Sequence, residues 1–122
     1  MAQKNTILER VSQQIANGSL FEIKMDGVAQ EMGVSKKTLY KMFGSKKAML
    51  DEALHFYLNK TVQRIEVAAK GRGSVKRRIL QAEIIAFDAL HGLFPHQWQF
   101  FDDKAKKNVT EEYIKKEKSW IN

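Results

Sequence analysis

The chain has 122 residues, no cysteine, one proline and a formal net charge of +7, so disulfides, thiolate metal sites and cysteine nucleophiles are excluded. Hydrophobic residues make up 43% of it and charged residues 29%, as in globular proteins, and the alternating runs typical of strands are nearly absent. No segment has the length of a membrane span or the pattern of a signal peptide. We therefore expect an all-α, cytoplasmic protein that does not contact a membrane.

The first predicted helix runs from about residue 4 to residue 17. Its apolar positions recur at helical spacing and would form one buried stripe, made of Ile7, Leu8, Val11 and Ile15. Gly18 is the stop signal, because glycine readily adopts the left-handed conformation that closes a helix. A short apolar connector is expected to enter the core next, through Leu20, Phe21 and Ile23.

Two short helices are predicted over residues 25–32 and 36–43. Gly33 lies in the three-residue turn between them, Ser35 can cap the second helix, and Gly44 ends it. Helices of this length joined by such a turn are typical of a helix-turn-helix. The sequence therefore predicts a DNA-binding motif in this segment.

The second short helix has an inner and an outer side. Leu39 and Phe43, four residues apart, are predicted to point into the core. The outer side would then carry cations and one hydroxyl, at a width that the major groove admits. These residues are Lys36, Lys37, Tyr40 and Lys41. The N-terminus of this helix, and that of the next helix at Ser45, would each suit a phosphate.

A long helix capped by Ser45 is predicted to continue to a linker at residues 70–73. Ser74 would cap a further helix, which has apolar residues on or near one face: Val75, Ile79, Leu80, Ile84, Ala86, Phe87 and Leu90. Residues 91–96, with the proline, are predicted to form a turn. The last predicted helix covers residues 110–120.

Residues 28–50 read VAQEMGVSKKTLYKMFGSKKAML, and this run resembles the signature of the TetR family of bacterial transcriptional regulators. The matching residues keep the family's spacing without a gap: Ala29, Gly33, Val34, Ser35, Thr38, Leu39, Tyr40, Phe43, Ser45, Lys46 and Leu50. The resemblance covers the N-terminal module. The remainder of the chain is similar to the family only in its helical character.

The resemblance implies a regulator that binds an operator as a homodimer and releases it when a small molecule occupies the C-terminal helical domain. It divides the chain into a DNA-binding domain, residues 1–50, and a connecting helix with a helical regulatory domain, residues 51–122. By carry-over, Tyr40 and Lys46 hold phosphates, while Ser35 and Thr38 seat the helix. The bases or the flanking backbone would be contacted by Lys36, Lys37 and Lys41.

Three residues depart from the family pattern. Lys24 stands where the family usually has a threonine that caps the second helix and often touches phosphate. Lys37 replaces a small residue and would either add a contact to DNA or push the helix outward. Lys47 replaces a common glutamate and adds positive charge. We keep Lys24 and Ser45 among the predicted DNA-binding residues.

The C-terminal part is shorter than in the family, because only about fifty residues follow the linker. We expect either a fragment, which we favour, or a reduced member with a different dimer interface. In a fragment, some apolar residues would be exposed: Phe87, Trp98, Phe101 and Trp120. The effector is not identified by the sequence, and the weak candidates for its binding site are Phe87, Trp98 and Phe101.

Other functions find less support. His91 and His96 flank the proline turn without the spacing of a metal site, and no nucleophile lies near a base. We therefore expect neither a metal, a cofactor nor an enzymatic activity. The alternative function is a helical protein-interaction module that does not read DNA, such as a truncated partner that sequesters a full-length subunit.

Overall fold

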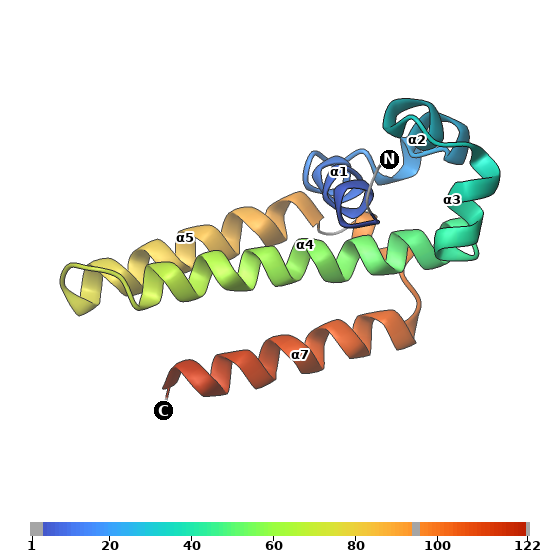
Figure 1. The fold of residues 1–122 in the computed structure, drawn as a ribbon. Helices are drawn as coiled ribbons and strands as arrows, with labels where there is room; N and C mark the ends of the chain where they lie inside the picture. Colours follow the sequence, from blue (N-terminus) through green and yellow to red (C-terminus); the bar gives the residue numbers. More distant parts are fainter. Residues whose placement is uncertain (1–3, 94–95, 122) are drawn as a thin grey trace. The chain divides into compact units, whose positions relative to one another are not determined.

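The computed structural model describes residues 4–93 and 96–121, and within these ranges every regular element is a helix (Figure 1). The elements in chain order are α1 (Lys4–Ala16), the 3-10 helix η1 (Leu20–Glu22), α2 (Met25–Met32), α3 (Lys36–Phe43), α4 (Lys46–Ala69), α5 (Val75–Leu93), α6 (His96–Phe100) and α7 (Asp103–Ile121). The predicted all-α class is confirmed. No helix in the described ranges is both long and apolar enough to cross a membrane.

The chain forms two compact units, Met1–Tyr57 and Leu58–Asn122. The division falls inside α4, whereas the sequence suggested a division after residue 50. The early turns of α4 belong to the first unit because their apolar side chains are completely buried there. These side chains are Met49, Leu50, Ala53 and Leu54.

The core of the first unit is built on the predicted stripe of α1, whose four apolar side chains are all buried. The connector after α1 was only partly predicted. Leu20 and Ile23 are 1% exposed, but Phe21 is 61% exposed, so the expectation that Phe21 enters the core was wrong. In a 3-10 helix the side chains three residues apart lie on one side. Leu20 and Ile23 therefore face the core together, and Phe21 points away from it.

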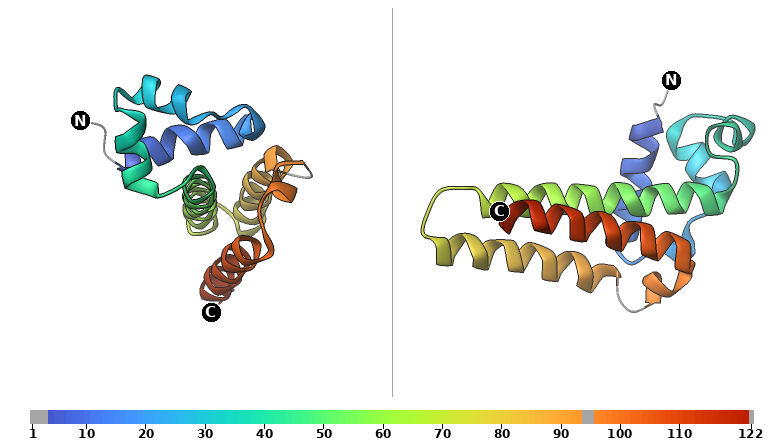
Figure 2. Two further views of the ribbon diagram at one scale, coloured as in Figure 1. Left: turned by 90° about the vertical axis from the view of Figure 1, so that its right-hand side faces the viewer. Right: turned by 90° about the horizontal axis from the view of Figure 1, so that it is seen from below.

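In the second unit, α5 and α7 lie alongside the C-terminal part of α4 (Figures 1 and 2). The predicted cap at Ser74 is confirmed, because its Oγ accepts the Arg77 backbone N–H at 3.2 Å. Arg78 Nη1 donates to the Ala69 carbonyl oxygen at 3.0 Å. This bond satisfies one of the carbonyl groups left without a partner at the end of α4.

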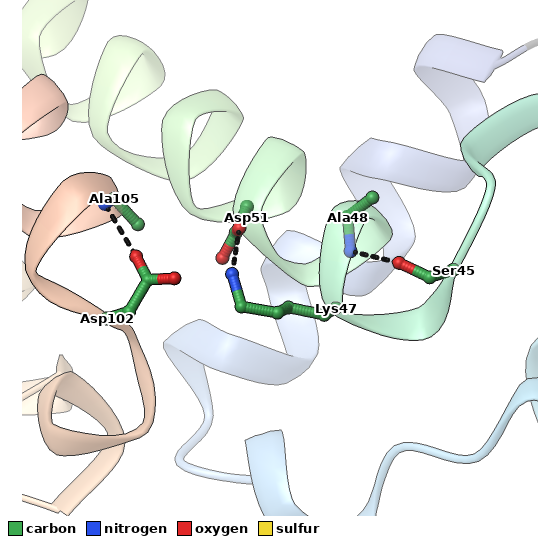
Figure 3. A network of polar contacts seen from close by, with 6 residues as sticks. All are labelled: Ser45, Lys47, Ala48, Asp51, Asp102 and Ala105. Atoms are coloured by element: carbon green, nitrogen blue, oxygen red, sulfur yellow. Dashed lines mark hydrogen bonds and ion pairs between the residues drawn. The ribbon is translucent and has the colours of Figure 1, made fainter.

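Two predicted boundaries in the second unit were wrong. The turn predicted at residues 91–96 was placed too early, because α5 continues through His91 to Leu93. Residues 94 and 95 lie outside the described ranges. The last helix begins at Asp103 rather than near residue 110. Asp102 caps it, since its Oδ1 accepts the Ala105 N–H at 2.9 Å (Figure 3). The short helix α6 between them was not predicted.

Candidate DNA-binding surface

The turn between α2 and α3 is closed by Gly33, which has a φ of 69°. The Val34 N–H donates to the Ala29 carbonyl at 3.0 Å, and the Gly33 N–H donates to the Gln30 carbonyl at 3.3 Å. These two bonds form a Schellman motif, which requires a left-handed residue at the position of Gly33. The angle between α2 and α3 therefore depends on a conformation that glycine adopts without steric cost.

We predict that Gly33→Ala and Gly27→Ala change the stability in opposite directions. Alanine at position 33 must adopt a positive φ, which costs about 1 kcal/mol. Gly27 lies within α2, and a Cβ built there meets no atom within 4 Å. Alanine at that position should therefore stabilise the helix by up to about 1 kcal/mol. Urea denaturation followed by far-UV circular dichroism checks both signs; two equal effects would contradict the assigned turn.

The inner side of α3 is anchored in the core as predicted. Leu39 is 0% and Phe43 is 7% exposed. The Lys4 ammonium group lies 5.2 Å from the centroid of the Phe43 ring, and it also pairs with Glu52 at 2.9 Å. The two buried side chains, with the contact between Lys4 and Phe43, fix the rotation of α3 about its axis.

The outer side of α3 presents two lysines. Successive residues of an α-helix are about 100° apart, so Lys37 and Lys41 lie one above the other, nearly opposite Leu39 and Phe43. Both lysines are exposed. Tyr40 lies on one flank of the helix and is 39% exposed. The predicted orientation of α3 is confirmed.

Five lysines lie between Gly33 and Leu50, and ion pairs divide this lysine cluster into two groups. Lys36 pairs with Asp26 in the first turn of α2 at 3.2 Å, and Lys47 pairs with Asp51 at 3.0 Å (Figure 3). The charge that Lys47 adds is thus balanced within its own helix. In the described part of the chain, the other lysines of the cluster form no ion pair. These are Lys37, Lys41 and Lys46.

The two acidic partners were missed by the sequence analysis. Asp51 could have been found, since a lysine and an aspartate four residues apart on one helix are neighbours. Asp26 could not, because it reaches Lys36 only through the folded turn. The absence of acidic residues between Gly33 and Leu50 therefore overstates the positive charge of this surface.

The predicted caps of α3 and α4 are both formed. Ser35 Oγ accepts the Thr38 N–H at 3.0 Å and donates to Thr38 Oγ1 at 2.8 Å. Ser45 Oγ accepts the Ala48 N–H at 3.0 Å (Figure 3). Because Ser35 uses its own proton on Thr38, the proton of the Thr38 hydroxyl can be donated to an anion. Lys46 begins α4, where the helix dipole favours a negative ligand.

Lys24 occupies the N-cap position of α2, and its side chain makes no capping hydrogen bond. Its backbone is extended, with a φ of −126° and a ψ of 141°, so the position has the geometry of a cap without the oxygen that a cap requires. An exposed ammonium group at this end of a helix opposes the helix dipole. A phosphate bound beside it would remove that cost.

A comparison with known protein families gives a match over the segment that contains α2 and α3. Residues 14–53 match the family described as bacterial regulatory proteins, tetR family. The chain therefore carries a DNA-binding module of the kind found in TetR-family regulators. The match to the TetR family covers α2 and α3 completely and the first turns of α4. Comparisons with curated proteins and with solved structures gave no significant match.

The three weak candidates for an effector site lie outside the TetR module, in the second unit. Trp98 lines a cavity there, which has a volume of about 230 Å³. Phe87 is 67% exposed on α5, as expected of an uncovered residue, whereas Phe101 is 2% exposed. The expectation that Phe101 is exposed was therefore wrong. The side chain of Trp120 lies outside the described residues.

Proposed function

We propose that this regulator is a repressor that binds operator DNA as a dimer and places α3 in the major groove. The observation that carries the proposal is the pair Lys37 and Lys41. The two ammonium groups are exposed, form no ion pair in the described part of the chain, and lie opposite the buried Leu39 and Phe43. Unpaired cations on one side of an anchored helix are suited to the negative potential of the groove.

The neighbouring residues suit contacts with phosphates. Tyr40 offers a hydroxyl on the flank of α3, and Lys46 offers an ammonium group at the N-terminus of α4. Thr38 has a hydroxyl proton to donate. Contacts of this kind position a helix in its groove and carry no sequence information themselves. Lys37 and Lys41 would then contact base edges or the adjacent backbone.

The proposed effector site is the cavity of about 230 Å³ between the C-terminal part of α4 and helices α5 and α7. Most of its lining is aliphatic or aromatic, including Leu58, Ile65, Leu93 and Trp98. Thr61, Thr110 and Tyr113 also line it, but the Thr110 hydroxyl donates to the Lys106 carbonyl oxygen at 2.7 Å. Such a lining suits a small, apolar molecule.

The experiment that tests the proposal is binding of labelled duplex DNA at about 50 mM and about 200 mM salt. About six neutralised phosphates per dimer would lower the affinity by roughly 10³-fold over this range. Tyr40→Ala combined with Lys46→Ala should weaken binding clearly and make it less dependent on salt. Repeating the measurement with small apolar compounds tests the effector part.

The alternative function, a protein-interaction module that does not read DNA, predicts a different result. A folded dimer that does not bind duplex DNA, or binds it independently of salt, would favour the alternative. The cation pair on α3 favours the DNA-binding function, because two exposed ammonium groups opposite the buried side of a helix suit a polyanionic partner.

A further inference from the structure

The most outward hydrogen-bonding groups of α3 are donors only. Lys37 and Lys41 are exposed on the side opposite the core, and an ammonium group has three donors and no acceptor. The sequence of α3 contains no asparagine, glutamine, aspartate or glutamate. The carboxylate of Asp26 pairs with Lys36 at 3.2 Å, and Lys36 lies on a flank of the helix. The outward side of α3 therefore offers donors to the surface that it faces.

The dimensions of the major groove direct these two lysines to the bases. A helix with its side chains is about 10–12 Å across, and the groove is about 12 Å wide. A helix in the groove therefore has its flanks against the two phosphate walls. The side opposite the buried Leu39 and Phe43 then faces the floor, where the base edges lie. Lys37 and Lys41 are on this side, whereas Tyr40 is on a flank.

A surface that only donates hydrogen bonds distinguishes guanine from the other bases. In the major groove, guanine presents two adjacent acceptors, N7 and O6. Adenine presents one acceptor beside an amino group, cytosine presents an amino group, and thymine presents one acceptor beside a methyl group. An ammonium group can bridge both acceptors of guanine, whereas on adenine and cytosine it meets another donor. The flexible four-carbon stem of lysine allows the ammonium group to reach this position.

We propose that Lys37 and Lys41 each recognise a guanine, and that the two guanines lie about two base pairs apart. The inference rests on the proposed function, which places α3 in the major groove, and it names the bases that α3 recognises there. Residues four apart on a helix are separated by about 6 Å along its axis. Successive base pairs are about 3.4 Å apart, so the two ammonium groups are separated by about two steps.

The test begins with a selection of preferred duplexes from a random library by the wild-type chain, at about 50 mM salt. The consensus should contain two guanines at the proposed spacing. Replacing either guanine–cytosine pair by adenine–thymine should weaken binding at least about fivefold. One copy of the motif is sufficient, so the result does not depend on dimerisation. A consensus without guanines at this spacing would overturn the proposal.

Two substitutions at position 37 test the assignment of the first guanine. Lys37→Arg keeps a side chain that only donates, so the preference for guanine should remain. Lys37→Gln provides one donor and one acceptor, so the preference at that base should change to adenine. The second guanine, assigned to Lys41, should stay preferred in both variants. Position 37 is exposed and both substitutes are good helix formers, so both variants should fold, which circular dichroism checks. An unchanged preference in Lys37→Gln would contradict the assignment.

The control for these variants is Lys36→Gln, which removes the same charge from the adjacent residue of α3. Lys36 pairs with Asp26 and lies on a flank of the helix, so its loss should lower the affinity without changing the preferred bases. Equal relaxation of the guanine preference by Lys36→Gln and Lys37→Gln would show that charge alone is decisive, and the proposed base contact would be wrong.

A guanine analogue in which carbon replaces N7 tests for direct contact. Placed at the first guanine, it should weaken binding of the wild-type chain and leave binding of Lys37→Ala unchanged, because that variant has no group to donate to N7. Equal losses in both proteins would exclude the contact.

The same measurements separate this inference from the proposed function. Failure of the folded chain to bind any duplex would refute the repressor function. Binding with strong salt dependence but without a preference for guanine would refute the recognition of guanine and leave the DNA-binding function intact.

Discussion

Replacing Lys37 and Lys41 together by alanine is expected to weaken binding to a selected duplex by about 10- to 100-fold and to lower the salt slope by about two. Both ammonium groups are exposed and form no ion pair in the described part of the chain. They can therefore neutralise phosphates or contact base edges without first breaking an ion pair.

The matched control is Lys36→Ala with Lys47→Ala, which removes the same charge from the same module. Lys36 and Lys47 are paired with Asp26 and Asp51, so their loss should weaken binding less and change the salt slope by less than one. Fluorescence anisotropy over a salt series measures both quantities. If the two double variants behave alike, the total charge decides binding, and the assignment of Lys37 and Lys41 as the contacting pair is wrong.

Leu39→Ala is expected to lower the free energy of unfolding of the first unit by about 3 kcal/mol, within the range for fully buried leucines. Leu39 is 0% exposed, and its truncation leaves a cavity beneath α3. A loss of this size is a large part of the roughly 5–15 kcal/mol that stabilises an ordinary domain. DNA binding should fall with the folded fraction.

Tyr40→Ala is the control for this variant, because Tyr40 is the adjacent residue and is 39% exposed. It should cost about 1 kcal/mol or less while still weakening DNA binding in the folded protein. Urea denaturation followed by far-UV circular dichroism measures the change. The chain's two tryptophans, Trp98 and Trp120, belong to the second unit, so their fluorescence reports that unit separately. A Leu39→Ala protein as stable as the wild type would disprove the burial of this residue.

The helix-turn-helix could be predicted residue by residue because its signals are local. Gly33 provides the left-handed turn. Ser35 caps α3 by accepting the backbone N–H of Thr38, three residues later. Leu39 and Phe43 recur at helical spacing and are buried. None of these features depends on a residue distant in the chain. The orientation of Lys37 and Lys41 follows from the same periodicity.

The second unit was predicted less well, because its local signals are ambiguous. The cap at Asp102 was hidden in a lysine-rich segment, so α7 was predicted to begin too late. The ring of Phe101 was expected to be exposed and is buried. A run of aromatic residues has no periodicity that distinguishes an inward from an outward side chain.

By itself, the sequence determined the all-helical class, the turn at Gly33 and the family of the DNA-binding module, since each follows from the order of neighbouring residues. Only the tertiary structure decided which lysines remain without a carboxylate, because Asp26 approaches Lys36 across a folded turn. It also decided which side of α5 is buried. Both sides are apolar, so periodicity could not choose between them, and the packed side contains Ala89 and Leu93 while Ile84 and Phe87 are left exposed.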